Sequence, residues 1–284
     1  MSFISYSQNF EDVMLWRALK NIEDGFYIDI GAAWPDEHSV TKAFYDKGWK
    51  GINVEPNLNH FRRLEIERPR DINLQVAVGD STGMLEMTIF EDTGLSTLVS
   101  NIAEVHVNNG YQCEKINVPV VTLAELIEKH LSPEQDVHFL KIDVEGMEEG
   151  VIRGNDWLAF RPWIIVIEAT VPMTDEDSYY NWETILIDAN YLFVYADGLN
   201  RFYIASEHSA LIENFKFPPN VFDEFITYDL YIANKKIQKL EFNNNIYMSR
   251  INEIEQEVSL ITNSLSWKLT NPLRKIKKII EKKL

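Results

Sequence analysis

Two apolar segments, each with a carboxylate at its end, place the strongest constraint on how this chain can fold. The first is Phe26–Ile30, which contains Asp29 and runs into a small-residue turn at Gly31. The second is Gly51–Val54, which is followed directly by Glu55. Their spacing of about one βαβ unit predicts two parallel strands. Backbone N–H groups in the first turn can approach a ligand, and an acidic residue after the second strand can bond ribose hydroxyls, so the pair predicts a nucleotide-cofactor site.

The turn after the first strand argues against a dinucleotide cofactor. A pyrophosphate needs a Gly-x-Gly-x-x-Gly turn, in which bare backbone approaches the phosphates. Here the turn has one glycine, and Trp34 and Pro35 stand where the backbone would need to be bare. A cofactor without phosphates, such as S-adenosylmethionine, needs less room. The alternative interpretation is that Asp29 and Gly31 only mark the end of a strand.

The remaining segments predict an α/β fold with a Rossmann-like, doubly wound and mostly parallel sheet. The other predicted strands are Asn73–Val78, the buried runs Val137–Ile142 and Trp163–Ile167, and a closing hairpin of Tyr191–Tyr195 and Arg201–Ala205.

Two helices and one insertion complete the expected domain. Helix formers run from Ser39 to Lys47, and Thr122–Glu125 forms a capping-box sequence that predicts a helix from Leu123 to His130. Short β-forming segments and turns between Met84 and Pro119 predict an inserted hairpin region. We expect this insertion to overhang the cofactor cleft.

Composition limits the domain count and the cellular setting. The chain has 284 residues and 45% hydrophobic content, which predicts one catalytic domain, residues 1–217, and a tail, residues 218–284. The single cysteine, Cys113, excludes an internal disulfide and suits a reducing cytoplasm. The start lacks a signal-peptide pattern, and the longest apolar run is too short to span a bilayer. We therefore expect a cytoplasmic protein.

The charge of the chain is unevenly distributed. The net charge of −17 argues against nucleic acid as a partner, because phosphate backbones are bound by clustered basic residues. Residues 268–284 contain seven basic residues and one acidic residue, which gives this segment +6 and leaves −23 for the rest. A basic end on an acidic body predicts peripheral contact with the inner face of the membrane, although a solvated basic tail is the plainer interpretation.

The tail carries two apolar patterns. Alternating spacings of four and three residues define a heptad seam of Tyr247, Ile251, Ile254, Val258, Ile261 and Leu265. This seam predicts either a coiled coil with homo-oligomers or a helix packed back on the domain. A second stripe of Leu273, Ile276, Ile279 and Ile280 lies among lysines and is typical of a helix in a membrane interface. Residues 264–274 also resemble a short C-terminal element of bacterial surface-polysaccharide glycosyltransferases.

Several motifs in one order give the chain a specific resemblance. They are SQNFED at 7–12, the Asp29 and Glu55 motifs, LKIDVEG at 140–146 and DGLNRF at 197–202. The first 205 residues or so resemble FkbM-type S-adenosylmethionine-dependent methyltransferases, in which the last strand runs antiparallel to the rest. One departure is that many members have Asn and a second Gly where this chain has Ala33, Trp34 and Pro35.

With this resemblance, nine residues are expected to bind the cofactor. Those at the methionine end are Gln8, Asn9, Asp29, Gly31 and Ala32; those at the ribose are Glu55 and Pro56; and those at the adenine are Val78 and Asp80. Ser96 and Thr97 match a family element and are expected to face the acceptor.

Three carboxylates are expected at the carboxyl edge of the sheet, where doubly wound folds bind ligands. Asp143 and Glu145 follow the fourth strand, and Glu168 ends the fifth. They are candidates for a general base or for ligands of a divalent metal, and oxygen ligands suit Mg²⁺. A purely structural alternative is that Asp143 and Glu145 end a strand and begin a helix.

Two further side chains are candidates for the chemistry. Lys141 lies two residues before Asp143 and on the same face of the strand, so it can pair with Asp143 or neutralise an alkoxide. His38 is the best placed of the histidines to act as a base, because it follows the cofactor turn.

The sequence therefore predicts an S-adenosylmethionine-dependent O-methyltransferase that acts on a sugar hydroxyl in bacterial surface polysaccharide biosynthesis, beside glycosyltransferase partners. Two alternatives stay open. One is methylation of a polyketide or another small metabolite, and the other is a catalytically inactive scaffold of the same fold that assembles glycosyltransferases.

Overall fold

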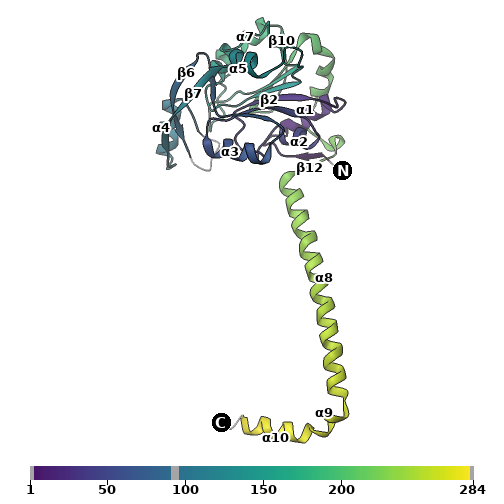
Figure 1. The fold of residues 1–284 in the computed structure, drawn as a ribbon. Helices are drawn as coiled ribbons and strands as arrows, with labels where there is room; N and C mark the ends of the chain where they lie inside the picture. The colour runs from purple at the N-terminus through teal and green to yellow at the C-terminus, as the bar shows by residue number, and fades with distance from the viewer. Residues whose placement is uncertain (1–2, 91–95, 282–284) are drawn as a thin grey trace. The chain divides into compact units, whose positions relative to one another are not determined.

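The computed structural model describes residues 3–90 and 96–281 of the chain. It forms two compact units, residues 1–228 and 229–284, which Figure 1 shows as a layered α/β body and a helical segment. Each unit is described by itself below.

A seven-stranded sheet forms the centre of the first unit, in the order β10-β11-β9-β8-β2-β3-β4. Its strands are β2 (Phe26–Ile30), β3 (Lys50–Val54), β4 (Ile72–Leu74), β8 (Phe139–Ile142), β9 (Ile164–Glu168), β10 (Tyr191–Ala196) and β11 (Asn200–Ala205). The five strands from β9 to β4 pair in parallel, whereas β11 pairs antiparallel with both β9 and β10. The predicted α/β class and the antiparallel closing hairpin are confirmed.

Helices cover both faces of this sheet because alternate strand residues are apolar on both sides. Tyr27 and Ile28 are consecutive and point to opposite faces, yet both are completely buried. Ile28 belongs to a core that includes residues of α5 (Leu123–His130), α6 (Glu148–Arg153) and α7 (Glu183–Asp188). Tyr27 belongs to a second core with α1 (Glu11–Leu19) and α2 (Lys42–Asp46). The helix α3 (Leu58–Glu67) lies next to β4.

The capping box at Thr122 is confirmed. Thr122 Oγ1 accepts a hydrogen bond from the backbone N–H of Glu125, and the Glu125 side chain accepts one from the N–H of Thr122. In contrast, α2 is shorter than the predicted span of Ser39 to Lys47. Thr41 Oγ1 donates instead to Asp29 Oδ2 at 3.0 Å, which draws this segment toward the sheet.

The predicted third strand, Asn73–Val78, is wrong as one element. Residues 72–74 form β4 in the central sheet, while β5 (Ala77–Gly79) joins a second sheet with β6 (Gly83–Ile89) and β7 (Glu114–Thr122). The split occurs because Ala77 packs into a separate small core, formed with residues of β6 and β7.

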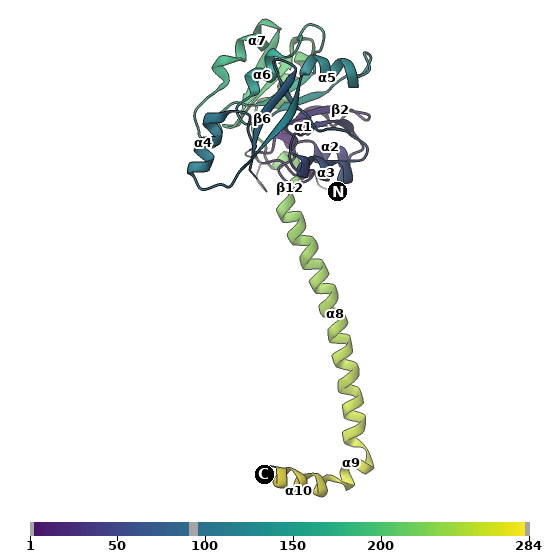
Figure 2. The same cartoon turned by 60° about the vertical axis from the view of Figure 1, so that its left-hand side comes forward.

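The second sheet confirms the predicted inserted hairpin region. The strands β6 and β7 pair antiparallel, and β5 pairs parallel with β7. A helix that the sequence did not predict, α4 (Ser100–Asn108), lies between β6 and β7 in the chain and beside them in Figures 1 and 2. Its β-branched residues had favoured a strand there.

Both ends of the first unit meet. The strand β1 (Phe3–Ser5) pairs in parallel with β12 (Phe225–Thr227). Three short 3₁₀ helices also belong to this unit: η1 (Tyr179–Asn181) precedes α7, and η2 (Ser206–Phe215) and η3 (Val221–Asp223) lie between β11 and β12. Arg17 Nη2 lies 2.7 Å from Asp223 Oδ2. Residues 218–228, which the sequence analysis assigned to the tail, therefore belong to the first unit.

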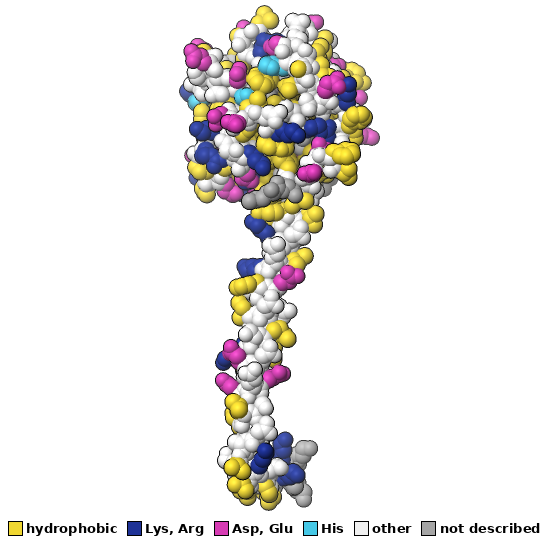
Figure 3. All heavy atoms as spheres, turned by 90° about the vertical axis from the view of Figure 1, so that its right-hand side faces the viewer, with side chains coloured by type: hydrophobic (Ala, Val, Ile, Leu, Met, Phe, Trp, Pro, Cys, Tyr) yellow, Lys and Arg dark blue, Asp and Glu magenta, His cyan; other side chains and the backbone are white. Residues whose placement is uncertain are grey.

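The second unit consists of helices alone, α8 (Tyr228–Asn263), α9 (Leu265–Leu269) and α10 (Asn271–Glu281). Ser264 separates α8 from α9, and its Oγ accepts from the N–H of Trp267. Apolar side chains follow α8, and basic side chains gather beside apolar ones near the C-terminal end (Figure 3). Among the helices within residues 3–90 and 96–281, none is long and apolar enough to cross a membrane.

Candidate active site

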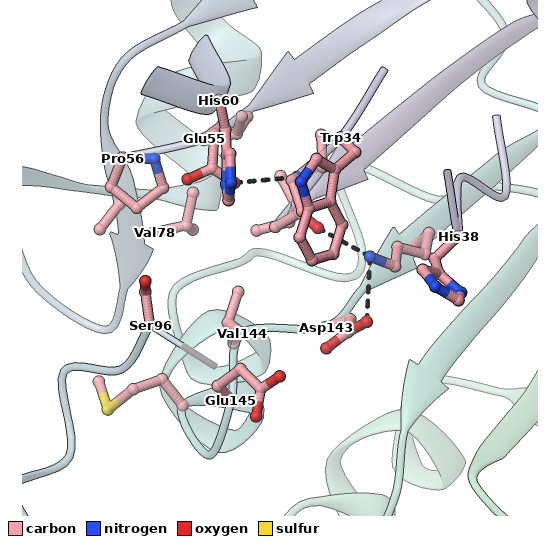
Figure 4. Close-up of a pocket in the computed structure, with 18 of the residues that line it drawn as sticks. Trp34, His38, Glu55, Pro56, His60, Val78, Ser96, Asp143, Val144 and Glu145 are labelled. Carbon is pink, nitrogen blue, oxygen red and sulfur yellow. Dashed lines mark hydrogen bonds and ion pairs between the residues drawn. The ribbon is translucent and has the colours of Figure 1, made fainter. Parts of the chain in front are cut away.

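A cavity of about 330 Å³ opens where β2, β3 and β8 end, at the carboxyl edge of the central sheet (Figure 4). The turn after β2 contributes Gly31, Ala32, Ala33, Trp34, Glu37 and His38, and β3 leads into Glu55 and Pro56. The segment after β8 contributes Asp143, Val144 and Glu145. Residues 76–78, Met87, Ser96 and Leu98 complete an apolar wall beside the second sheet, as the sequence predicted for the insertion. The volume is in the range of sites for small molecules.

Glu55 joins the first two strand ends. Its carboxylate is buried, with Oε2 accepting from the N–H of Ala33 at 2.9 Å and Oε1 from the N–H of Asn57 at 2.7 Å. Burial raises the pKa of Glu55 to about 7, although the two N–H donors act in the opposite direction. Each carboxylate oxygen has two lone pairs, so Glu55 can also accept hydrogen bonds from a ligand in the cavity.

The turn after β2 is pressed against the end of β8. Gly31 has φ 81°, and a Cβ at this position would lie 1.8 Å from the backbone oxygen of Asp143. Only glycine fits there. The N–H groups of Gly31 and Ala32 both donate to the carbonyl of Val54, at 3.0 and 3.1 Å. The sequence had predicted that N–H groups of this turn approach the cofactor, but these two are paired within the protein.

Lys141 binds the ends of β2 and β8 together. Its Nζ donates to the carbonyl of Gly31 at 2.8 Å and lies 3.2 Å from Asp143 Oδ2 and 3.5 Å from Asp29 Oδ1. Burial alone would lower the pKa of Lys141, but Asp143 and Asp29 outweigh it and hold the pKa above its ordinary value. The predicted pairing of Lys141 with Asp143 is confirmed.

Asp29 has a different place from the one predicted. It is buried behind the cavity wall and is not among the described residues that line the cavity. Burial raises its pKa, and Lys141 opposes the rise. Asp29 therefore positions Lys141 and Thr41, whereas Gly31 and Ala32, which were predicted for the same part of the cofactor, do line the cavity.

The three acidic candidates differ in environment. The Asp143 side chain is 37% exposed and lines the cavity. Glu145 also lines it, and burial together with the neighbouring Asp143 raises its pKa to about 9, which favours the protonated form. Glu168 is buried outside the cavity lining, and burial, then Asp143 and Glu145, raise its pKa well above the ordinary value. Within the described part of the chain, no group of three or more His, Cys, Asp or Glu residues could hold a metal ion, so these three do not assemble as the predicted ligand set.

The other predicted residues divide into two groups. Gln8, Ala32, His38, Pro56, Val78 and Ser96 line the cavity. The imidazole of His38 is half exposed, and its Nε2 lies 3.8 Å from Glu37 Oε1.

Three predicted residues lie outside the lining defined by the described residues. The N–H of Asn9 donates to Glu11 Oε2 at 2.9 Å, and Asp80 is exposed and accepts from Ser81 Oγ. Thr97 is buried and donates to the carbonyl of Glu145 at 2.7 Å, so it supports the cavity wall.

Sequence reasoning missed a polar pair in the cavity, Glu11 and Asn200. Both line the cavity, and Asn200 Nδ2 donates to Glu11 Oε1 at 2.8 Å across 189 positions of sequence. Burial raises the pKa of Glu11 to about 7. A signal was present, because the two residues lie in the motifs at 7–12 and 197–202.

The sequence also did not predict how the Trp34–Pro35 turn is held. Arg68 is fully buried and donates through Nε and Nη2 to the carbonyl of Pro35, at 2.9 and 2.7 Å. The indole of Trp34 packs on His60, with ring centroids 5.1 Å apart, and projects into the cavity (Figure 4). The unusual turn is therefore a fixed wall of the cavity.

The model of the methyltransferase FkbM domain matches residues 29–194, more than half of the chain. The chain belongs to the FkbM methyltransferase family. The match begins at Asp29 within β2 and covers β3 and β8, so it includes the ends of these strands, which form the cavity. FkbM methyltransferases generally use S-adenosylmethionine. A sequence search of curated proteins gave no match.

Replacing Lys141 with methionine is expected to lower the free energy of unfolding by about 3–5 kcal/mol, because Asp29 would keep a buried charge without its cation. The double variant K141M/D29N removes that charge and is expected to regain much of the loss. Urea denaturation at neutral pH measures both. The control K216M alters an exposed ion pair with Glu213 and should leave the stability nearly unchanged. Equal losses in K141M and the double variant would contradict the pairing.

Proposed function

We propose that this protein is an S-adenosylmethionine-dependent methyltransferase that methylates a sugar hydroxyl in bacterial surface polysaccharide biosynthesis. The observation that carries the proposal is that one cavity holds both the buried Glu55 carboxylate and the Lys141–Asp143 pair. The first suits the ribose of the methyl donor, and the second suits a hydroxyl acceptor.

The cavity residues fit the donor. Glu55 has spare lone pairs for ribose hydroxyls, and Pro56 follows it along the wall. Residues 76–78, with Met87 and Leu98, offer an apolar slot of the kind an adenine ring occupies. When bound, S-adenosylmethionine supplies an electrophilic methyl group. Gln8 at the cavity rim and the Glu11–Asn200 pair provide polar groups for its methionine end.

On the acceptor side, Asp143 is the proposed general base. Its carboxylate reaches the cavity and is paired with Lys141, so it can take the proton of an acceptor hydroxyl. The Lys141 ammonium stabilises negative charge that develops on the acceptor oxygen. Glu145, in the protonated form that its raised pKa favours, can donate a hydrogen bond to a second hydroxyl of the acceptor. A polyol such as a sugar suits this arrangement.

Two other functions compete with this one. A hydroxylated polyketide or small metabolite would use the same base, and the tail segment 264–274, with its glycosyltransferase resemblance, favours the glycan instead. The inactive scaffold rests on the departure from the family pattern at Trp34 and Pro35, of which Trp34 lines the cavity. Glycosyltransferase partners remain compatible with either function.

Wild-type protein is expected to bind S-adenosylmethionine in calorimetry, and E55A is expected to lose most of the affinity. Glu55 is largely ionised above its pKa of about 7, and an ionised carboxylate accepts stronger hydrogen bonds. Affinity should therefore fall as the pH decreases from 8 to 6 in wild type, and E55Q should reduce this pH dependence to the part that Glu11, whose pKa is also about 7, contributes. E128A, on the exposed side of α5, serves as the control. Absence of binding by wild type at every pH would refute the donor site.

The variant D143N is expected to lower turnover by about 10²–10⁴ while it still binds the donor, because the base is removed and the shape is kept. Turnover is measured as S-adenosylhomocysteine release with a panel of monosaccharides and nucleotide sugars, and with hydroxylated small metabolites in parallel. H38Q should retain activity. Loss in H38Q with activity retained in D143N would instead assign the base to His38, and turnover only with the small metabolites would refute the sugar acceptor.

The helix α10 supports a place at the inner face of the membrane. Leu273, Ile276 and Ile280 lie on one side of this helix and are exposed. Its basic residues within the described part are Arg274, Lys275, Lys277 and Lys278; Lys277 borders the apolar side, and the other three lie toward the opposite side. This distribution is that of a helix lying in an anionic lipid interface. A cytoplasmic enzyme held there would meet lipid-linked glycans.

The full chain is expected to pellet with vesicles containing phosphatidylglycerol, and less at high salt, because lysine and arginine interact with anionic headgroups. The double variant I276D/I280D and deletion of residues 268–284 should both abolish pelleting, and K275R should not. Equal pelleting with pure phosphatidylcholine vesicles, or no effect of the deletion, would contradict the lipid contact.

A further inference from the structure

The helix α8 is long and carries many exposed apolar side chains. It runs without interruption for 36 residues, about 54 Å at the usual rise per residue. All of its residues are described, and none is buried. A helix in a protein gains most of its stability from packing of its apolar face. The exposed apolar residues of α8 therefore indicate that this helix packs against another chain or segment.

The apolar residues of α8 form a longer seam than the sequence analysis recognised. Spacings of three and four residues alternate through Ile237, Leu240, Asn244, Tyr247, Ile251, Ile254, Val258 and Ile261. The seven apolar members are between 45% and 67% exposed. Leu265, which the sequence analysis included, lies in α9 beyond the break at Ser264. The seam therefore covers four consecutive heptads within one helix.

We infer that α8 pairs with α8 of a second copy of this chain in a parallel, two-stranded coiled coil. A spacing of three from Ile237 to Leu240 places Ile237 at position a and Leu240 at position d. The remaining a positions are then Asn244, Ile251 and Val258. β-Branched residues at a favour two strands when Leu stands at d, which holds here at Leu240, whereas Ile254 and Ile261 at d favour more strands. The single Asn at a decides for the pair, because it selects an oligomer and a register in which the two asparagines meet. That meeting occurs when the two helices are parallel and aligned.

The charges beside the seam agree with this orientation. In a parallel pair, position g of one helix lies beside position e of the following heptad in the other. Lys236 then meets the second copy's Glu241, and Arg250 meets its Glu255, so both pairs are attractive. Arg250 also contacts Glu253 of its own helix, 2.7 Å from Nη1 to Oε2, on the exposed surface.

An antiparallel pair would be opposed by the same charges. It brings g positions beside g positions and e positions beside e positions. An antiparallel register centred near residue 243 would set Lys236 against Arg250, and one centred near residue 248 would set Glu241 against Glu255. Like charges in such places weaken association.

A parallel pair has a consequence for the tail. Each α10 follows its own α8 by only a few residues, so two basic amphipathic helices lie at the same end of the coiled coil. Two linked contacts bind a surface more tightly than one, without any new interaction. The dimer would thus strengthen the lipid contact. The inference that the chain forms a dimer depends neither on the lipid contact nor on the proposed activity.

The mass of the full chain in solution tests the pairing. Light scattering after size exclusion should give twice the chain mass of 33.1 kDa. I251K/I254K places two charges in the seam and should give monomers, with the circular dichroism of the α/β unit retained. Q256K, on the outer face of α8, is the matched control and should stay dimeric. Wild-type monomers at all concentrations, or trimers, would overturn the inference.

Cysteine cross-linking tests the orientation. Cys113 is the sole cysteine, so C113S provides a clean background. I237C and V258C occupy a positions about 30 Å apart along the helix. Each should form a disulfide-linked dimer under oxidation if the helices are parallel and in register. Failure of both in a chain that is dimeric by mass would show an antiparallel pair and overturn the proposal.

A charge-reversal cycle tests the register. K236E sets like charges beside Glu241 and should weaken the dimer, and E241K should do the same beside Lys236. The double variant K236E/E241K restores opposite charges and is expected to recover the wild-type dissociation constant, measured by sedimentation. Additive weakening in the double variant would contradict the assigned register.

Discussion

The Lys141 ammonium is the interaction on which the rest of the site depends. A buried cation is costly unless it is paired and hydrogen-bonded. Here it is satisfied by the Gly31 carbonyl and the carboxylates of Asp29 and Asp143, which come from two neighbouring strands. These contacts require the ends of β2 and β8 to stay at one separation. The turn after β2 and the Asp143 carboxylate are consequently held in place by contacts within the protein.

The same edge of the sheet holds neighbouring carboxyl groups in different environments. Asp143 is partly exposed and paired with Lys141, whereas Glu145 is more buried and has a pKa of about 9. Glu55, at the end of β3, titrates near neutrality because burial outweighs its two N–H donors. Residues of one chemical type thus differ in exposure and in the charges around them, and burial is the main cause of the raised pKa values of Glu55 and Glu145. The Trp34–Pro35 turn, anchored by Arg68, closes this region on one side.

The second unit is marked by exposed apolar residues along α8. No residue of its long helix α8 is buried, so the apolar seam of α8 is exposed along its whole length. Association with an identical helix would bury the seam and pair Asn244 with its counterpart, and this packing would supply the stability that a single exposed helix lacks. In such a pair, Asn244 and the charges of Lys236, Glu241, Arg250 and Glu255 would set the orientation and register of the two helices. The basic amphipathic helix beyond it, α10, has the features of a lipid-facing element, and pairing would present it twice.

The sequence by itself determined the features that depend on local order. Strand runs such as Phe26–Ile30, the capping box at Thr122 and the pairing of Lys141 with Asp143 follow from periodicity and from neighbours one to three residues apart. Tertiary structure alone decided which distant segments meet. The Glu11–Asn200 contact and the division of residues 72–79 between two sheets depend on partners far away in the chain. Local patterns do not encode such contacts, because burial by remote segments decides between alternatives that are locally equivalent.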